Sequence, residues 1–177
     1  LSKALDYLKN PHQVCIETDI PSNLTFVEGV EKIKKQPQGE YDLLITVDSS
    51  DEQRLGALSE EFFLAKRKKI DTVNIDHHVS NTRFAKYNFV QDCAANCMNI
   101  AQLISYMGVS LDKKIAEYLL LGLLTDSGNF SHDDVTEETL LLAAKLVKAG
   151  ADICSLNYNL FKKQTKERAT LFGKVMG

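Results

Sequence analysis

The sequence lacks the features that mark a membrane protein or a disulfide-stabilised protein. Its longest apolar run, residues 118–124, is far shorter than the roughly 20 residues that a membrane-spanning helix needs. The four cysteines are spaced neither as a disulfide framework nor as a paired CxxC zinc site, and no secretory signal is recognisable. We therefore expect free thiols, a cytoplasmic location and no association with a membrane.

The sequence also lacks an excess of basic residues. Its formal net charge is −3 and its pI is about 5.8, which gives no support for a protein that coats nucleic acid. A small phosphorylated substrate is still compatible with this charge, because a bound metal ion supplies positive charge locally. The 177 residues, 44% of them hydrophobic, are enough for one domain with a sizeable core.

Predicted strands alternate with predicted helices along most of the chain. We expect strands at residues 13–17, 41–47, 71–75 and 89–90, and helices at residues 2–8, 27–35, 52–67, 94–107, 112–124, 136–149, 152–161 and 165–176. This alternation predicts an α/β fold with a mainly parallel sheet flanked by helices. We assign that domain to residues 1–150, and residues 151–177 to a C-terminal helical linker that leads toward a second domain.

Several local features follow from residue type. The near-continuous apolar run in residues 41–47 is typical of a strand that is covered on both faces. We expect Asp51, Ser110 and Thr136 to cap the helices that follow them, and residues 125–132 to form a loop. The basic cluster at residues 66–69 is interpreted as a solvated helix end, where cations are favoured.

Two polar clusters follow predicted strands directly. Asp48 comes after one apolar strand, and Asp76-His77-His78 comes after the next. Because ligands of open parallel sheets bind outside the carboxyl ends of the strands, we expect these side chains to converge on one edge of the sheet. A third cluster, residues 125–130, contributes Asp126 as a candidate ligand.

This combination of carboxylates and imidazoles suits Mn²⁺, Fe²⁺ or Zn²⁺. A shared aspartate can bridge two metal ions, and such a pair can lower the pKa of a bound water and align a phosphoryl group. Taken alone, an aspartate after a strand, such as Asp48, is more often a helix cap or a turn former than a metal ligand. Two adjacent histidines at a strand end are harder to explain structurally, because their desolvation requires partners. His132 is a further residue that could face the site.

Three segments resemble, in order, the second, third and fourth motifs of the DHH phosphoesterase family. They are Leu-Leu-Ile-Thr-Val-Asp48, Asn-Ile-Asp-His-His-Val-Ser-Asn81 and Gly-Leu-Leu-Thr-Asp126-Ser-Gly-Asn-Phe130. The resemblance covers about residues 1–150 and is strongest to the bacterial enzymes that degrade very short RNA (nano-RNA) and dephosphorylate 3′-phosphoadenosine 5′-phosphate (pAp). It implies a phosphoesterase acting on short oligonucleotides, linear dinucleotides or nucleotide phosphates.

The resemblance also implies roles for individual residues. Asp48 would bridge two Mn²⁺ ions, and His77 and Asp126 would complete one metal position, with Mg²⁺ or Co²⁺ as alternative ions. His78 would contact the scissile phosphate, and Asp76 would orient a histidine. Asn81 and His132 would then join His78 in binding substrate. Relatives commonly form homodimers, which makes a homodimer an expectation for this chain as well.

Two expected parts of the family pattern have no counterpart in the sequence. Nothing resembles the family's first motif, a His and two Asp residues on the first strand, and nothing resembles its glycine-rich C-terminal domain. The chain opens at Leu1 inside a helical pattern, and we expect further sequence upstream in the parent protein. We therefore expect an active parent and weak or no activity from this stretch alone. Two alternatives stay open: a non-catalytic nucleotide-binding module, and an enzyme acting on inorganic pyrophosphate or polyphosphate.

Overall fold

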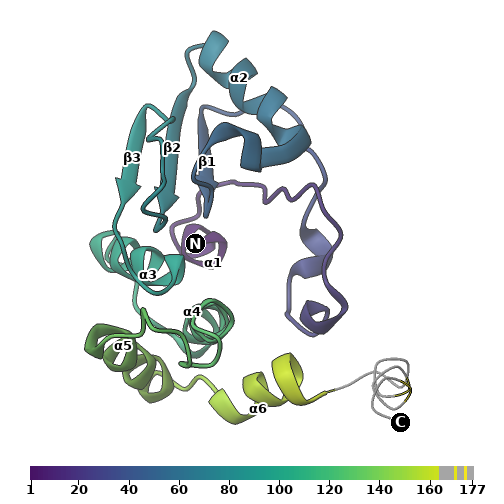
Figure 1. Ribbon diagram of the computed structural model, residues 1–177. Helices are drawn as coiled ribbons and strands as arrows, with labels where there is room; N and C mark the ends of the chain where they lie inside the picture. The colour runs from purple at the N-terminus through teal and green to yellow at the C-terminus, as the bar shows by residue number, and fades with distance from the viewer. Residues whose placement is uncertain (164–169, 171–173, 175–177) are drawn as a thin grey trace.

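A three-stranded parallel sheet organises the computed structural model, which describes residues 1–163 together with Thr170 and Lys174. The strands are β1 (Leu43–Val47), β2 (Asp71–Asp76) and β3 (Tyr87–Val90), in the order β1-β2-β3. Their register aligns Val47 with Ile75 and Asp76 with Val90, so the carboxyl ends of all three strands lie at the same edge (Figure 1). The prediction of an α/β fold with a parallel sheet is confirmed.

Helices cover the sheet on both sides (Figure 1). The elements that share the main core with the sheet are α1 (Ser2–Tyr7), α3 (Asn96–Tyr106), α4 (Lys113–Asp126), α5 (Glu137–Lys148), α6 (Ile153–Asn157) and the π-helical turn Tyr158–Lys162. The opposite face is covered by the 3₁₀ segment Glu52–Leu58 and α2 (Ser59–Arg67), whose Phe62 packs against Phe84.

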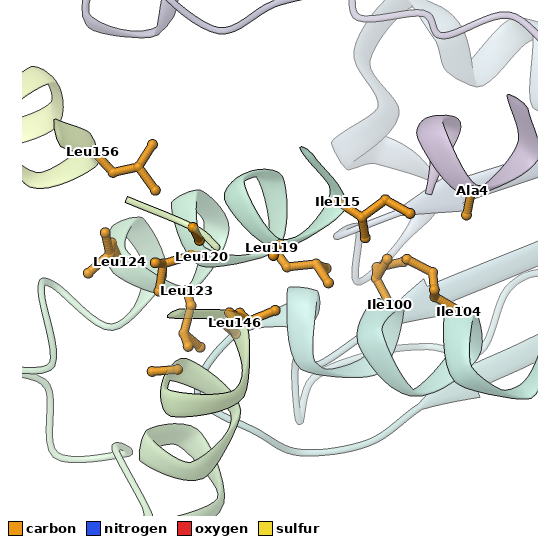
Figure 2. Packing of buried hydrophobic residues seen from close by; sticks show 14 of the residues in the cluster. Ala4, Ile100, Ile104, Ile115, Leu119, Leu120, Leu123, Leu124, Leu146 and Leu156 are labelled. Carbon is orange, nitrogen blue, oxygen red and sulfur yellow. The ribbon is translucent and has the colours of Figure 1, made fainter. Parts of the chain in front are cut away.

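Helix α4 lies at the centre of the main core. Figure 2 shows its leucines between α3, α5 and α6, with Leu120 and Leu123 fully buried. Each such side chain contributes about 1.5–3 kcal/mol when it leaves water. The helix begins at the cap that Asp112 provides, because the Asp112 carboxylate accepts a hydrogen bond from the backbone N–H of Ile115 at 2.8 Å. The predicted cap at Ser110 is therefore wrong by two positions.

Helix α4 also ends later than the sequence suggests. The hydroxyl of Thr125 donates to the carbonyls of Leu121 and Gly122, and α4 continues through Asp126. The predicted loop at 125–132 therefore begins only at Ser127. This places Asp126 on a rigid helix end rather than on a loop.

Two predicted elements near the N-terminus do not form. Residues 13–17 make only an isolated parallel bridge between Cys15 and Lys34, and residues 27–35 contain only the 3₁₀ turn Val30–Lys32. An isolated short strand gains too few hydrogen bonds to be stable, and the left-handed φ of +94° at Gly29 interrupts the expected helix. The predicted helix at 52–67 is split in the same way by Gly56, with φ +56° and ψ −134°. Its predicted cap is confirmed, because Asp51 accepts from two backbone N–H groups.

Strand β1 is less covered than its sequence implies. Leu43 and Val47 are 45% and 47% exposed, whereas Ile45 between them packs against the main core. Because β1 lies at an edge of the described sheet and α3 packs on β2, the two ends of β1 are left uncovered. The expectation of a strand covered on both faces holds only at the centre of β1, where Ile45 packs against the main core and Leu44 packs against the small core under α2.

The C-terminal segment is helical at its start. Leu156 of α6 and Leu160 of the following turn are buried in the main core, which agrees with the predicted helix at 152–161. The predicted helix at 165–176 lies outside the described residues, apart from two isolated positions. In the part of the chain that the structure describes, no helix has the length and apolar character to span a membrane.

Candidate metal-binding site

The carboxyl edge of the sheet begins with Asp48, the residue directly after β1. Its backbone N–H donates to the carbonyl of Ile75 at 2.9 Å, which joins the ends of β1 and β2. Its φ is +59°, a left-handed conformation that Asp and Asn tolerate better than most residues. This turn directs the carboxylate away from the sheet, where its side chain is 51% exposed.

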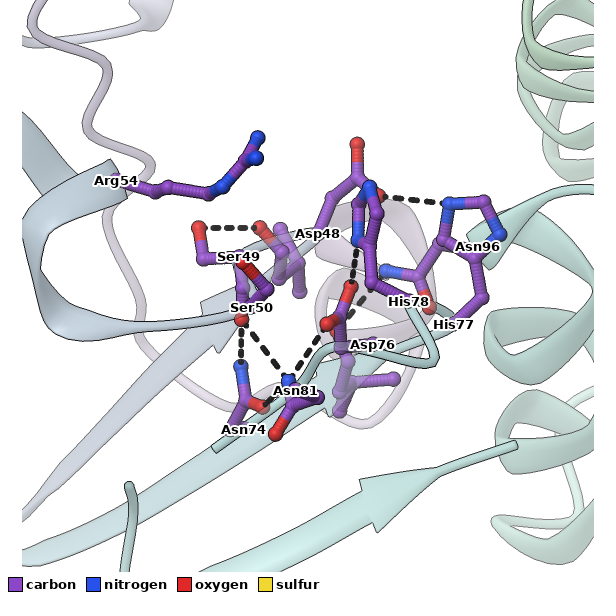
Figure 3. Close-up of polar contacts among 12 residues, drawn as sticks. Asp48, Ser49, Ser50, Arg54, Asn74, Asp76, His77, His78, Asn81 and Asn96 are labelled. Carbon is purple, nitrogen blue, oxygen red and sulfur yellow. Dashed lines mark hydrogen bonds and ion pairs between the residues drawn. The ribbon is translucent and has the colours of Figure 1, made fainter. Parts of the chain in front are cut away.

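His77 faces Asp48 across this edge (Figure 3). Its Nε2 lies 3.3 Å from Asp48 Oδ1, and its Nδ1 donates to the backbone carbonyl of Cys93 at 2.8 Å. Because a carbonyl oxygen can only accept, Nδ1 carries a proton and Nε2 is the atom presented to Asp48. Histidines that bind metals are commonly fixed by such a bond from the second ring nitrogen.

The raised pKa of His77 shows that the Asp48 carboxylate attracts positive charge. Its hydrogen bond to Asp48 is the largest effect and raises the pKa of His77 to about 9, against the opposing effect of burial. The hydrogen bond to Cys93 and the charge of Asp126 act in the same direction as Asp48. The pair therefore holds a positively charged imidazolium beside a carboxylate, and a divalent cation on Nε2 would satisfy the same carboxylate.

Asp76 lies beneath the histidines and is fully buried. Its Oδ1 accepts from His78 Nδ1 at 2.7 Å and its Oδ2 accepts from Asn81 Nδ2 at 2.6 Å. Burial by itself would raise the pKa of Asp76, but these hydrogen bonds and one from the backbone of His77 hold it below its ordinary value. Both carboxylate oxygens are therefore engaged within the protein, and Nε2 is the His78 nitrogen that is left to act outward.

Two asparagines, Asn74, which is buried, and Asn81, which is half-buried, link the strand ends below the site (Figure 3). Asn74 Nδ2 donates to Thr46 Oγ1 at 3.0 Å and to the Ser49 carbonyl at 3.1 Å. Asn81 Nδ2 donates to Asn74 Oδ1 at 2.8 Å as well as to Asp76. Asn74 is not among the site residues predicted from the sequence, although an asparagine two residues before Asp76 in a buried strand is itself a signal, because strands are depleted in Asn.

Helix α3 supports the same strand end from the other side. Asn96 Nδ2 donates to the carbonyl of Ile75 and Asn99 Nδ2 donates to the carbonyl of Asp76, both at 2.9 Å. Both asparagines are buried, at 5% and 1% exposure. Neither of them has a role predicted from the sequence, and they fix the backbone from which His77 and His78 project.

Asp126 approaches the site from the end of α4. Burial raises its pKa first, and the charge of Asp48 raises it further, whereas His77 lowers it together with a hydrogen bond from the backbone N–H of Asn96. Asp126 is thus close enough to interact electrostatically with both Asp48 and His77. It lies outside the tighter group formed, among the described residues, by Asp48, Asp76, His77 and His78, whose ligand atoms are all within 4.8 Å of one another.

The remaining predicted site residues take different positions. Asn81 lies beneath the cluster, where its amide bonds to protein groups. His132 is exposed and covers Gly128, where an added Cβ would clash with the His132 ring. The structure therefore gathers Asp48, Asp76, His77 and His78 closely, adds Asp126 at the side, and does not bring His132 into the cluster. One imidazole nitrogen with two carboxylates is a donor set that fits Mn²⁺ and similar divalent ions.

Comparison with known families and sequences agrees with this geometry. Residues 1–123 match the model of the DHH family, N-terminal domain. The bifunctional oligoribonuclease and PAP phosphatase NrnA of Thermus thermophilus is 33% identical over 147 residues, which cover 80% of this chain and 42% of that protein. The protein of the same name from Mycoplasma genitalium is 30% identical over 137 residues, covering 74% of this chain and 40% of its own length.

A solved structure has a similar fold. An exopolyphosphatase-related protein from Bacteroides fragilis superposes with a TM-score of 0.86 at 19% sequence identity. The superposition covers 98% of this chain and 54% of that protein. The chain thus spans about half or less of the length of the relatives that it matches.

Proposed function

The chain belongs to the DHH family, and from this premise we propose that it carries part of a metal-dependent phosphoesterase site for short oligonucleotides or nucleotide phosphates. The single observation that carries the proposal is the pairing of His77 Nε2 with the Asp48 carboxylate, beside a His78 that Asp76 holds in place. The family is metal-dependent. Among the described residues, Asp48, Asp76, His77 and His78 form the cluster of side chains that could bind a metal ion.

We assign Asp48, His77 and Asp126 as the metal ligands, with Asp48 as the residue shared between two ions. Mn²⁺ is the proposed ion, and Mg²⁺ or Co²⁺ are the alternatives. When bound, the metal centre supplies positive charge to the phosphoryl oxygens and activates a water for attack. The three carboxylates at this edge, Asp48, Asp76 and Asp126, outnumber its two imidazoles. The resulting negative charge favours the binding of a divalent cation.

The roles of the other residues follow from their hydrogen bonds. Nδ1 of His78 is bound to the buried Asp76 carboxylate, so Nε2 of His78 is directed outward and can donate to a phosphoryl oxygen when the ring carries a second proton. Asn81 holds the second oxygen of Asp76 and thereby keeps the carboxylate in this orientation. Asp76 and Asn81 act through His78 in this scheme, and we retain His132 only as a residue that a longer substrate could reach.

The proposed substrate class rests on sequence similarity more than on geometry. Two relatives at 33% and 30% identity are named as oligoribonuclease and PAP phosphatase. We therefore favour nano-RNA, linear dinucleotides and pAp. Inorganic polyphosphate is the second candidate, because the Bacteroides fragilis protein is described as exopolyphosphatase-related, but at 19% identity that likeness concerns the fold.

The number of ligands limits what this chain does alone. Asp48, His77 and Asp126 would give one metal ion three protein ligands, and they would give a second ion only the shared Asp48. We therefore propose that full activity requires ligands from outside the described residues, and that the chain alone hydrolyses substrate weakly or not at all. A non-catalytic nucleotide-binding module is the alternative that would follow if no such ligands exist. The division into residues 1–150 and a linker at 151–177, the cytoplasmic location and a homodimer are further parts of the proposal.

Hydrolysis assays test both levels of this proposal. The 177-residue chain and its full-length parent are incubated with Mn²⁺ and either a linear dinucleotide or pAp, and released nucleotide and phosphate are measured. We expect turnover by the parent that EDTA removes and that His77→Ala lowers by orders of magnitude. Near-normal turnover by that variant would exclude His77 from the site, and robust turnover by the 177-residue chain would refute the inference from ligand number.

A further inference from the structure

A cavity lies at the opposite end of the sheet from the metal-binding cluster. Its volume is about 510 Å³, and its lining consists of Lys66, Lys69, Ile70, Thr72, Phe84, Ala85 and Lys86. These residues come from the end of α2, the start of β2 and the segment before β3. In Figure 1, β2 and β3 both begin at the end of the sheet that lies away from α3. The six residues of β2 separate the cavity from the Asp76 end by about 17 Å.

The charge of this lining is opposite to that of the whole chain. The lining contains three lysines and no acidic residue, whereas the chain has a net charge of −3. The interpretation of the basic cluster as a helix end accounts for Lys66, in the last turn of α2. It does not account for Lys86, which comes from a different segment of the chain and lines the same cavity.

The three lysines differ in how far they are already neutralised. Lys66 Nζ donates to the carbonyl of Phe84 at 3.2 Å and lies 3.8 Å from Glu52, and Lys86 is paired with Asp71. The side chain of Lys69 has no ion-pair partner among the described residues and is exposed. The cavity therefore keeps a net attraction for anions after the internal pairs are counted.

The floor of the cavity is apolar. Phe84 and Ala85 are each 9% exposed, and they belong to the small core under α2. A volume of about 510 Å³ lies within the usual range for small-molecule sites.

We propose that this cavity is a second site, which binds an anion with two or more linked phosphoryl groups. Three lysines from two segments line the cavity, and lysine binds phosphate as a mobile point charge. The shared chemistry is the linked phosphates, which a nucleoside diphosphate and inorganic pyrophosphate both carry. The site does not depend on the proposed hydrolysis, since none of its residues belongs to the metal-binding cluster.

Binding measurements without metal test this site separately from the hydrolysis. The chain with His77→Ala, in EDTA, is titrated with ADP and in a second arm with pyrophosphate, by isothermal calorimetry and by amide chemical shifts. We expect saturable binding with shifts at residues 66–72 and 84–86, and about a tenfold weaker affinity in Lys69→Ala and in Lys86→Ala, as expected for losing one charge-assisted contact. Tighter binding of ADP than of pyrophosphate would indicate that the nucleoside contacts the apolar floor, and equal binding would indicate that only the phosphates are recognised. Both results support the proposal.

The control is Lys148→Ala, which removes an exposed lysine from the last turn of α5, far from this cavity in the chain. This variant should bind ADP and pyrophosphate as tightly as the His77→Ala chain without a lysine substitution. Thermal unfolding should show that all three lysine variants are folded. Absence of saturable binding to both ligands, shifts confined to the His77 edge, or an affinity unchanged by Lys69→Ala and Lys86→Ala would overturn the proposal.

Discussion

Nε2 of His77 lies 3.3 Å from Oδ1 of Asp48, although the two residues come from the ends of different strands. The parallel register that pairs Val47 with Ile75 brings them together, and the left-handed turn at Asp48 directs its carboxylate outward. The bond from His77 Nδ1 to the Cys93 carbonyl then selects the tautomer. This pair and the residues that support it determine how the site titrates and how stable the strand ends are.

The first prediction concerns the titration of His77 in the metal-free protein. Asp48 raises its pKa from the ordinary value of 6.5 to about 9. Because the folded-state pKa is the higher one, the pairing stabilises the protein fully below pH 6.5, and this stabilisation is lost as the pH rises through about 9. A titration of the imidazole by NMR in EDTA should show the raised pKa, and Asp48→Asn should bring it down. A pKa near 6.5 for His77 in the unsubstituted protein would contradict the pairing.

The second prediction concerns the buried carboxylate. Asp76→Asn keeps the shape but removes the charge that binds His78 Nδ1. Substitution of residues that orient a functional histidine typically costs about 10–100-fold in activity, so hydrolysis by the full-length parent should fall by that factor. Nitrogen chemical shifts should show that the Nδ1–H tautomer of His78 is no longer fixed. Asp133→Asn, at an exposed position, is the control and should change neither quantity; an unchanged tautomer in Asp76→Asn would contradict the assigned role.

The third prediction concerns stability. Asn74→Ala removes the amide that joins Thr46, Ser49 and Asn81, so that each of these groups loses one of its hydrogen bonds. Such losses typically cost about 1–3 kcal/mol. Urea denaturation should show a lower free energy of unfolding by this amount, whereas Asn23→Ala, at an exposed position, should be near neutral. Equal stability of the two variants would show that the asparagine network does not hold the strand ends.

The fourth prediction concerns Asp126, which the helix end holds beside His77 and Asp48. Asp126→Asn removes a carboxylate that is raised in pKa by burial and by Asp48, so the repulsion between Asp126 and Asp48 disappears. The metal-free protein should therefore be at least as stable as before, while the affinity for Mn²⁺ should fall. Thermal unfolding with and without Mn²⁺ measures both effects. A variant that loses stability without metal and keeps its response to Mn²⁺ would exclude Asp126 as a ligand.

Much of the site follows from local sequence patterns. Apolar strands that end in Asp48 and in Asp76-His77-His78 are readable from residue type, because the rule for parallel sheets places such ends together. The helices α3, α4 and α5 follow from their periodicity and from glycines or caps at their ends. The confirmed parallel sheet follows from the same alternation.

Other features depend on contacts that sequence patterns do not contain. The exposure of Leu43 and Val47 depends on which strands the core helices cover. The extension of α4 to Asp126 depends on the Thr125 hydroxyl bonding back to the preceding turn. The position of His132 over Gly128, and the lysines that reach one cavity from two segments, depend on the path of loops. Propensity and periodicity describe single segments, so they do not predict which side chains from different loops meet in space.

Binding of Mn²⁺ to the metal-free chain and to its His77→Ala variant, measured by isothermal calorimetry with electron paramagnetic resonance, tests the central claim most directly. If Asp48 and His77 hold the ion, the chain binds Mn²⁺ with nitrogen coupling from one imidazole. His77→Ala should then lose that coupling and at least tenfold in affinity, while His132→Ala keeps both. Equal affinity of the unsubstituted chain and the His77→Ala variant for Mn²⁺, or nitrogen coupling that survives the substitution, would contradict the assignment of this edge of the sheet as the metal site.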